Sequence, residues 1–208
     1  LRDHAVNSVT CDHVAAGRML ASRLAAAGHR QFGIIAGHDD YSVASERQRG
    51  ACERLAELGL PAPLVAPGGY DYRSGALGLK AIIAQLGGVP DALICGSDVM
   101  AIGCLDYARH ELGLDVPGQL SVAGFDAVEP SNWISYNLTT LRQPLPKMAA
   151  AAADLLCARI GQHDGETEQR VFGAQFIEGA TARLTPAAAP LAQPARAAGG
   201  LRLPVAIM

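Results

Sequence analysis

Short apolar segments that recur between helix-length stretches constrain this fold more than any other feature of the sequence. Residues 32–36, 92–95 and 120–123 are almost unbroken apolar runs, each too short for a helix, and each is followed directly by a glycine. Strands of this kind are buried on both faces, because a strand with one wet face alternates apolar and polar residues. Their alternation with helices predicts an α/β fold, in which helices cover parallel sheets on both faces.

The expected elements alternate along most of the chain. Asp12 can cap the first helix and Gly28 ends it, and Asp98 is expected to cap the helix that follows residues 92–95. We expect helices over residues 14–27, 43–58, 74–86, 99–112 and 146–160. We expect strands over residues 32–36, 63–66, 92–95, 120–123, 138–141 and 171–177.

Parallel sheets of this type bind their ligands in the crevice beyond the carboxyl ends of the strands. The residues that directly follow the expected strands are therefore the first candidates for a site. They are residues 37–39, 67–72, 96–98 and 124–126, and they include Ser97, Asp126 and the aromatic Tyr70.

The composition of the 208 residues excludes several classes of protein. The chain has 17 basic and 20 acidic residues, a net charge of −3. This charge disfavours a protein that binds nucleic acid through electrostatic attraction alone. No stretch approaches the roughly 18 consecutive apolar residues of a membrane span, so no membrane partner is expected. The five cysteines, an odd number without a CxxC pair, disfavour a disulfide framework or a structural zinc site and fit buried thiols in the cytoplasm.

Sequence signatures of cofactor and catalytic chemistry are missing. The glycines never fall in a GxG spacing, and neither a GxxxxGK[ST] phosphate loop nor a GxSxG elbow occurs. The six histidines show no metal-ligand spacing. We therefore expect no cofactor, no metal and no enzymatic activity. Residues 185–208, rich in Ala and Pro, are typical of a linker or tail.

Three segments resemble motifs of the LacI/GalR (lactose-repressor) family of bacterial transcription regulators. They are PDALICGSDVMAIG at residues 90–103, VPGQLSVAGFD at residues 116–126 and LTTLRQP at residues 138–144. Further similar segments run from Val9 to Arg183 in the order of the family. Each motif alone is weak, but together they are strong.

The resemblance implies the family's effector-binding part, a type I periplasmic-binding-protein-like fold with two parallel-sheet subdomains, of which the N-terminal one is incomplete here. On that basis we expect the remainder of the N-terminal subdomain at residues 1–36 and 144–162. The C-terminal subdomain is expected at residues 37–143 and 163–184, followed by the tail. The family's helix-turn-helix domain does not precede Leu1, so we expect contact with DNA only through that missing part.

The resemblance also assigns candidate residues for binding a small-molecule effector. Arg47 and Asp126 match the family's effector-binding arginine and the aspartate of its GfD motif, a donor fork and an acceptor pair suited to adjacent hydroxyls. Tyr70 occupies the position of a stacking aromatic, and Ser97 stands where the family often has Asn. Two further candidates are Asp12, for which helix capping competes with ligand contact, and Gln143, at the crossing between subdomains.

We expect an allosteric sensor whose effector, a sugar or sugar derivative by default, binds between the subdomains and is coupled to DNA binding. A purine or an acid stays open as the effector. The resemblance implies a cytoplasmic homodimer that makes contact through residues 99–108 and 127–133, where Trp133 is expected to pack. The alternative is a solute-binding protein of a sugar transporter. An enzyme acting on a sugar or nucleoside is a third possibility, disfavoured because no nucleophile or acid–base pair stands out.

Overall fold

The computed structural model describes residues 6–38, 40–160 and 167–186. The helices are α1 (His13–Ala26), α2 (Ser42–Glu57), α3 (Tyr72–Leu86), α4 (Asp98–Asp106) and α5 (Leu145–Arg159). The strands are β1 (Ser8–Cys11), β2 (Phe32–Ile35), β3 (Leu64–Ala66), β4 (Ala92–Cys95), β5 (Ser121–Ala123), β6 (Thr140–Arg142), β7 (Gln169–Phe172) and β8 (Gln175–Ile177). A π-helical turn extends α4 over Tyr107–Glu111.

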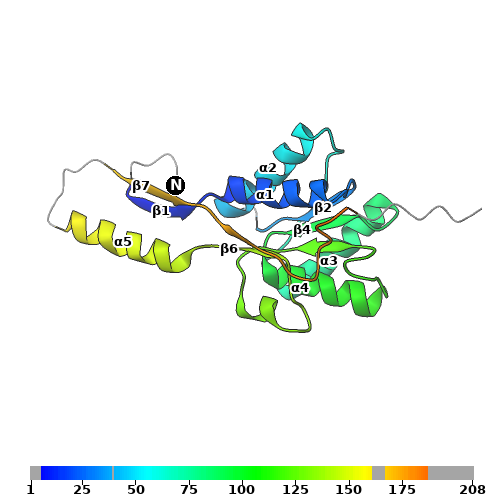
Figure 1. Ribbon diagram of the computed structural model, residues 1–208. Helices are drawn as coiled ribbons and strands as arrows, with labels where there is room; N and C mark the ends of the chain where they lie inside the picture. Colours follow the sequence, from blue (N-terminus) through cyan, green and yellow to red (C-terminus); the bar gives the residue numbers. More distant parts are fainter. Residues whose placement is uncertain (1–5, 39, 161–166, 187–208) are drawn as a thin grey trace, which may run out of the picture.

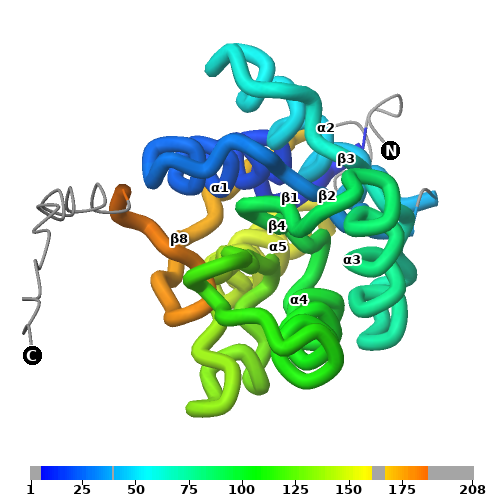
Figure 2. The backbone as a smooth tube through the Cα atoms, turned by 90° about the vertical axis from the view of Figure 1, so that its right-hand side faces the viewer, coloured from blue at the N-terminus to red at the C-terminus, as the bar shows by residue number. Residues whose placement is uncertain are grey.

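A four-stranded sheet in the order β3-β2-β4-β5 forms the centre of the body, and all its strands are parallel. Successive side chains of a strand point to opposite faces, and here each face has its own core. Ile34 and Ile94 pack with residues of α1 and α2, whereas Ile35 and Leu93 pack with residues of α3 and α4. Burial on both faces is the reason for the unbroken apolar runs, and the predicted α/β fold is confirmed (Figures 1 and 2).

A smaller unit extends from this body as an arm made of β1, β7 and α5 (Figure 1). The parallel pair β1–β7 is its only sheet within the described ranges, and α5 packs against β1. An antiparallel pair, β6–β8, runs along the connection between body and arm. Three segments therefore cross between the two units: β1 into α1, β6 into α5, and β7 into β8.

These pairings differ from the expected division of the chain. Phe32–Ile35 joins the larger sheet through β3 and β4, although it was placed with the smaller subdomain. The chain also returns to the arm at Gln169–Phe172, where β7 pairs with β1. We accordingly assign β1, α5 and β7 to one subdomain and the remaining elements to the other; the division itself stays a proposal.

The boundaries show where local patterns were misleading. The strand predicted over residues 171–177 is two strands, which end and begin on either side of Gly173 and pair in different sheets. β1 was not expected from the sequence, because Ser8 and Thr10 interrupt the apolar residues of this four-residue strand. The expected tail lies mostly outside the described residues.

Among the described helices, none is long and apolar enough to span a membrane. All five cysteines are free thiols. Cys95 and Cys104 face each other in the core, with their sulfurs 3.7 Å apart.

Two glycines let α1 and α2 approach each other closely. A Cβ at Gly50 of α2 would collide with the carbonyl oxygen of Val14, and a Cβ at Gly17 of α1 would collide with that of Arg47. Because both obstacles are backbone, neither can move aside without shifting a helix. The close approach thus fixes where α2 holds Arg47.

We expect Gly50→Ala to lower the free energy of unfolding by about 1–3 kcal/mol, because overpacking outweighs the higher helix propensity of Ala. Gly88→Ala is the matched control, since a Cβ at Gly88 meets nothing within 4 Å. Urea unfolding of both variants measures the difference. Equal stabilities would mean that the helices do not depend on this contact.

Candidate functional site

A buried ion pair lies beyond the carboxyl ends of β2, β4 and β5. Arg47, only 4% exposed, reaches from α2 to Asp126, with Nη2 and Oδ1 2.7 Å apart. Its Nη1 donates to the carbonyl oxygen of Gly96, directly after β4, at 2.7 Å. The ring of Phe125 lies against the guanidinium, 4.6 Å from Cζ to the ring centroid. The fork is therefore fixed on several sides before any ligand arrives.

His13 supplies a further contact to Arg47 that the sequence reading did not single out. Arg47 Nε donates to His13 Nδ1 at 3.3 Å, so that ring nitrogen acts as the acceptor. Burial, together with the charge of Arg47, lowers the pKa of His13 from 6.5 to about 4. A neutral imidazole is what this contact needs, because a protonated ring would repel the guanidinium. The only sequence signal was a histidine at the start of a helix near Asp12.

Asp126 gathers the polar groups of the site. Gln143 Nε2 donates to its Oδ1 at 2.9 Å, so the structure brings Arg47, Asp126 and Gln143 together. The Asp126 side chain is 29% exposed, which leaves part of the carboxylate open to solvent. The backbone is in the left-handed region, at φ 101° for Asp126 and 51° for Ala127. This loop therefore holds the carboxylate in a conformation that non-glycine residues rarely adopt.

Tyr70 lies at the same end of the sheet, packed on Gly37, which follows β2. A Cβ at Gly37 would overlap the phenol ring, so any larger residue there would displace the Tyr70 side chain. The Tyr70 hydroxyl is buried and has no hydrogen-bond partner among the residues that the structure describes. Burial raises the pKa of Tyr70, and Arg47 and Asp126 are near enough to influence it. An unsatisfied buried hydroxyl is costly, so it is a natural contact for a polar group of a ligand.

The other candidate residues take part in helix capping. Ser97 caps α4 by accepting from the amide of Met100 at 3.4 Å, so the expectation that Asp98 is the cap is wrong. Asp12 caps α1 by accepting from the amide of Ala15 at 2.9 Å, which confirms the capping interpretation. The hydroxyl oxygen of Ser97 and Oδ1 of Asp12 thus accept hydrogen bonds within the protein. Contact with a ligand stays a prediction for these two residues.

The free space beside the Arg47 guanidinium is small, a partly open volume of about 10 Å³ whose lining includes Gly96 and Phe125. Apart from Arg47 and Gln48, the residues that line this space are apolar or glycine, and Asp126 and Gln143 are not among them. Within the described part of the chain, no group of three or more His, Cys, Asp or Glu residues could hold a metal ion. The cluster thus presents a guanidinium, a carboxylate and an amide for hydrogen bonding, without a paired nucleophile and base.

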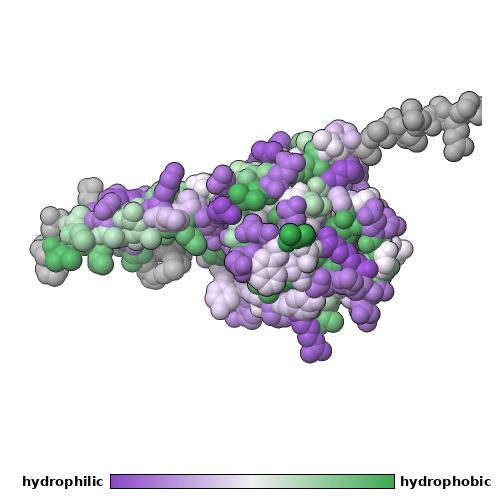
Figure 3. Space-filling model, turned by 60° about the horizontal axis from the view of Figure 1, so that its bottom comes forward, coloured by the Kyte–Doolittle hydropathy of each residue, from purple (hydrophilic) through white to green (hydrophobic). Residues whose placement is uncertain are grey.

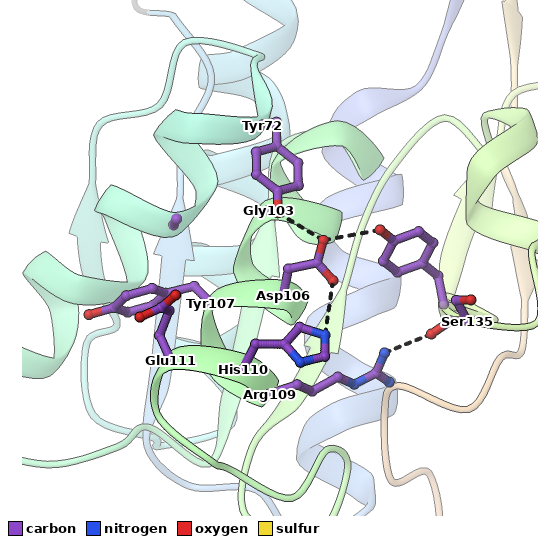
Figure 4. A pocket seen from close by; sticks show the side chains of 10 residues that line it. Tyr72, Gly103, Asp106, Tyr107, Arg109, His110, Glu111 and Ser135 are labelled. Carbon is purple, nitrogen blue, oxygen red and sulfur yellow. Dashed lines mark hydrogen bonds and ion pairs between the residues drawn. The ribbon is translucent and has the colours of Figure 1, made fainter.

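A larger hollow of about 800 Å³ lies on the outer side of α4, away from the strand ends (Figure 4). At its centre Asp106 accepts from the hydroxyls of Tyr72 and Tyr136, at 2.8 and 3.0 Å. His110 lies on the other side of the carboxylate, and Arg109 donates to the carbonyl of Ser135. These polar groups satisfy one another at the surface of α4, where the contact between two copies was expected.

Comparison with known proteins agrees with this architecture. The model of the periplasmic binding protein-like domain matches residues 21–182. An uncharacterized HTH-type transcriptional regulator of Streptomyces limosus is 35% identical over 184 residues, 86% of this chain and 51% of the relative. The ribose operon repressor of Haemophilus influenzae is 34% identical over 72% of this chain and 45% of its own length.

A solved structure described as a complex of the transcriptional regulator CelR with cellobiose superposes with a TM-score of 0.80. Its sequence is 28% identical, and the match covers 85% of this chain and 54% of that one. The chain thus spans about half the length of the curated relatives it matches.

The lowered pKa of His13 predicts a pH dependence of stability. Between pH 6.5 and about 4 the unfolded chain binds a proton at this residue that the folded chain does not bind. The free energy of unfolding should therefore fall as the pH is lowered through this range, by up to about 3 kcal/mol from this one group.

Replacement His13→Asn should remove that part of the pH dependence, as measured by urea unfolding at several pH values. The same change at His110, whose side chain is 75% exposed, is the control for loss of a histidine. Parallel profiles for His13→Asn and the unmodified chain would contradict the assignment of His13 as a neutral acceptor.

Proposed function

The chain belongs to the family of LacI-type transcriptional regulators through its periplasmic binding protein-like domain, and we propose that it senses a small polar effector for such a regulator. The observation that carries this proposal is the convergence of Arg47, Asp126 and Gln143 beyond the strand ends. Three side chains from separate segments are aimed at one point, and one carboxylate oxygen accepts from both of the others.

The chemistry of these groups favours a sugar. A guanidinium donates two parallel hydrogen bonds and a carboxylate accepts two, a pattern that fits the adjacent hydroxyls of a pyranose or furanose. The ring of Tyr70 offers a flat apolar surface for the CH face of such a ligand, and its hydroxyl, which has no partner within residues 6–38, 40–160 and 167–186, offers one more polar contact. The ribose operon repressor and the CelR–cellobiose complex among the relatives support the same class.

The crossing segments suggest how binding is communicated. An effector that contacts Gln143 after β6, Asp126 in the body and groups of the arm favours one arrangement of the two subdomains over another. It shifts this equilibrium only by the difference between its affinities for the two arrangements. In the whole regulator, this shift would alter the geometry of the DNA-binding part, which the HTH-type relatives possess and which we propose for the complete protein.

We further propose that two copies associate through the outer side of α4. Trp133 and Ile134, 50% and 101% exposed, are apolar side chains on the surface beside the Asp106 hollow. Val99 of α4 is also exposed. Apolar groups gathered next to polar ones in this way are typical of a protein interface.

A thermal-shift screen with D-ribose, cellobiose, sugar acids, sugar phosphates and purines tests the effector proposal. A ligand at ~100 times its dissociation constant stabilises the folded chain by ~2.7 kcal/mol, and we expect a sugar to give such a shift. Asp126→Ala should abolish it, because the acceptor pair for the hydroxyls is lost.

Asp154→Ala, an exposed change on α5, is the control and should keep the shift. An equal shift in Asp126→Ala would contradict the assigned site. If no compound in the panel shifts the melting temperature of a chain that melts cooperatively, the result would contradict the proposed effector binding.

Ile134→Asp should convert a dimer to a monomer in light scattering after gel filtration. The side chain is fully exposed, so the substitution leaves the fold intact while placing a charge in the interface. Leu58→Asp, on the surface at the end of α2, is the control and should leave the mass of the assembly unchanged. A dimer that persists in Ile134→Asp would place the contact elsewhere.

A further inference from the structure

Asp98 is a completely buried acid at the start of α4, directly beside the loop that carries Asp126. Its backbone N–H donates to the carbonyl oxygen of Phe125 at 2.8 Å, and its Oδ2 accepts from the amide of Val128 at 2.9 Å. One residue therefore holds the chain on both sides of Asp126 and Ala127. Ser97 caps α4, so these contacts of Asp98 are additional to what the helix itself requires.

The loop between those two contacts needs such support. Asp126 and Ala127 both have positive φ values, which are unfavourable for residues with a side chain unless the surroundings hold them. A Cβ at Gly124 would collide with Oδ1 of Asp98, so the carboxylate is packed directly on the backbone of the loop. The conformation that aims Asp126 at Arg47 is thus formed against Asp98.

The same carboxylate also binds the strand that crosses between the two units. Thr140 Oγ1 of β6 donates to Asp98 Oδ1 at 2.5 Å, and the amide of Asp126 donates to the carbonyl oxygen of Leu141 at 2.8 Å. Two residues beyond Leu141, Gln143 reaches back to Asp126. Asp98 therefore fixes the loop of Asp126 and the strand leading to Gln143 relative to each other.

Electrostatics make this contact sensitive to protonation. Burial raises the pKa of Asp98 to about 7, against the hydrogen bonds from Thr140 and Val128, which lower it. The neighbouring charge of Asp126 raises it further, and Asp126 is itself paired with Arg47. The contact from β6 is the neutral hydroxyl of Thr140. Ionised Asp98 accepts hydrogen bonds more strongly than the protonated acid does.

We propose that Asp98 is a positioning residue of the effector site: it holds Asp126 in the orientation that faces Arg47 and Gln143, without touching the ligand. The inference rests on the proposed function of these three residues. It extends that function to a carboxylate that lies behind the loop and links it to the crossing strand.

Amide hydrogen exchange of the full chain, followed by NMR without any ligand, tests the proposal. In Asp98→Asn the side chain keeps its shape but has one acceptor oxygen instead of two. We expect the amide of Val128 to exchange about tenfold faster, the effect of losing a hydrogen bond to a charged acceptor. The amide of Asp126, which donates to the carbonyl of Leu141, should also exchange faster because the loop that carries it is less well held. The amides of Leu93 and Ile94 in β4 should keep their protection.

The pH profile separates positioning from a general loss of stability. In the unmodified chain, the protection of Val128, corrected for intrinsic exchange, should rise as the pH passes through about 7, where Asp98 ionises. The profile should be flat in Asp98→Asn. Thr140→Ser, which retains the hydroxyl, should behave as the unmodified chain, whereas Thr140→Val should loosen the loop.

Asp71→Asn is the matched control. Asp71 is also an aspartate at the start of a helix, where it caps α3, but it does not contact the loop of Asp126. It should leave Val128 unchanged. Equal acceleration in the loop and in β4, or an unaltered Val128, would overturn the proposal. Because no ligand is present, a silent effector panel beside a loosened loop would overturn the proposed function alone.

Discussion

The buried guanidinium of Arg47 is the constraint around which the body of this protein is arranged. A charge taken out of water is costly unless it is paired and its donors are satisfied, and Arg47 has partners from four directions. Asp126 neutralises the charge, Gly96 and His13 accept from the remaining nitrogens, and Phe125 covers one face. These partners come from three separate segments, at His13, at Gly96 and at Phe125–Asp126, so the ion pair requires the helices and strand ends to hold one arrangement.

Other parts of the fold hold the segments around Arg47 in this arrangement. Hydrophobic cores on both faces of the central sheet hold its strands in place. Gly17 and Gly50 let α2 lie close enough to α1 for Arg47 to contact His13. Asp98 and the crossing strand β6 support the strained loop of Asp126. On the face seen in Figure 3, the body is mostly polar, whereas the arm shows more apolar side chains. The contacts that support the fold here are therefore the same ones that we propose for effector binding.

Much of this arrangement could be predicted, because parallel strands bring distant residues to one edge. The apolar runs around Ile34 and Ile94 located the strands and placed Asp126 at a strand end, while the family resemblance singled out Arg47 and Gln143. The roles of Ser97 and Asp98 could not be told apart, since adjacent polar residues at a helix start can both cap it. His13 and β1 gave weak local signals, because their burial depends on partners far away in the sequence.

The most direct test of the account is an NMR titration of the chain with D-ribose and with cellobiose, followed at every assigned amide and at the Arg47 Nε–H. If the Arg47–Asp126 pair is the effector site, shifts will concentrate on Gly96, Asp126, Gln143 and the Arg47 side chain as the ion pair exchanges its contacts for sugar hydroxyls. Shifts that instead gather around Asp106, Tyr72 and Tyr136, with the Arg47 signal unmoved, would contradict it.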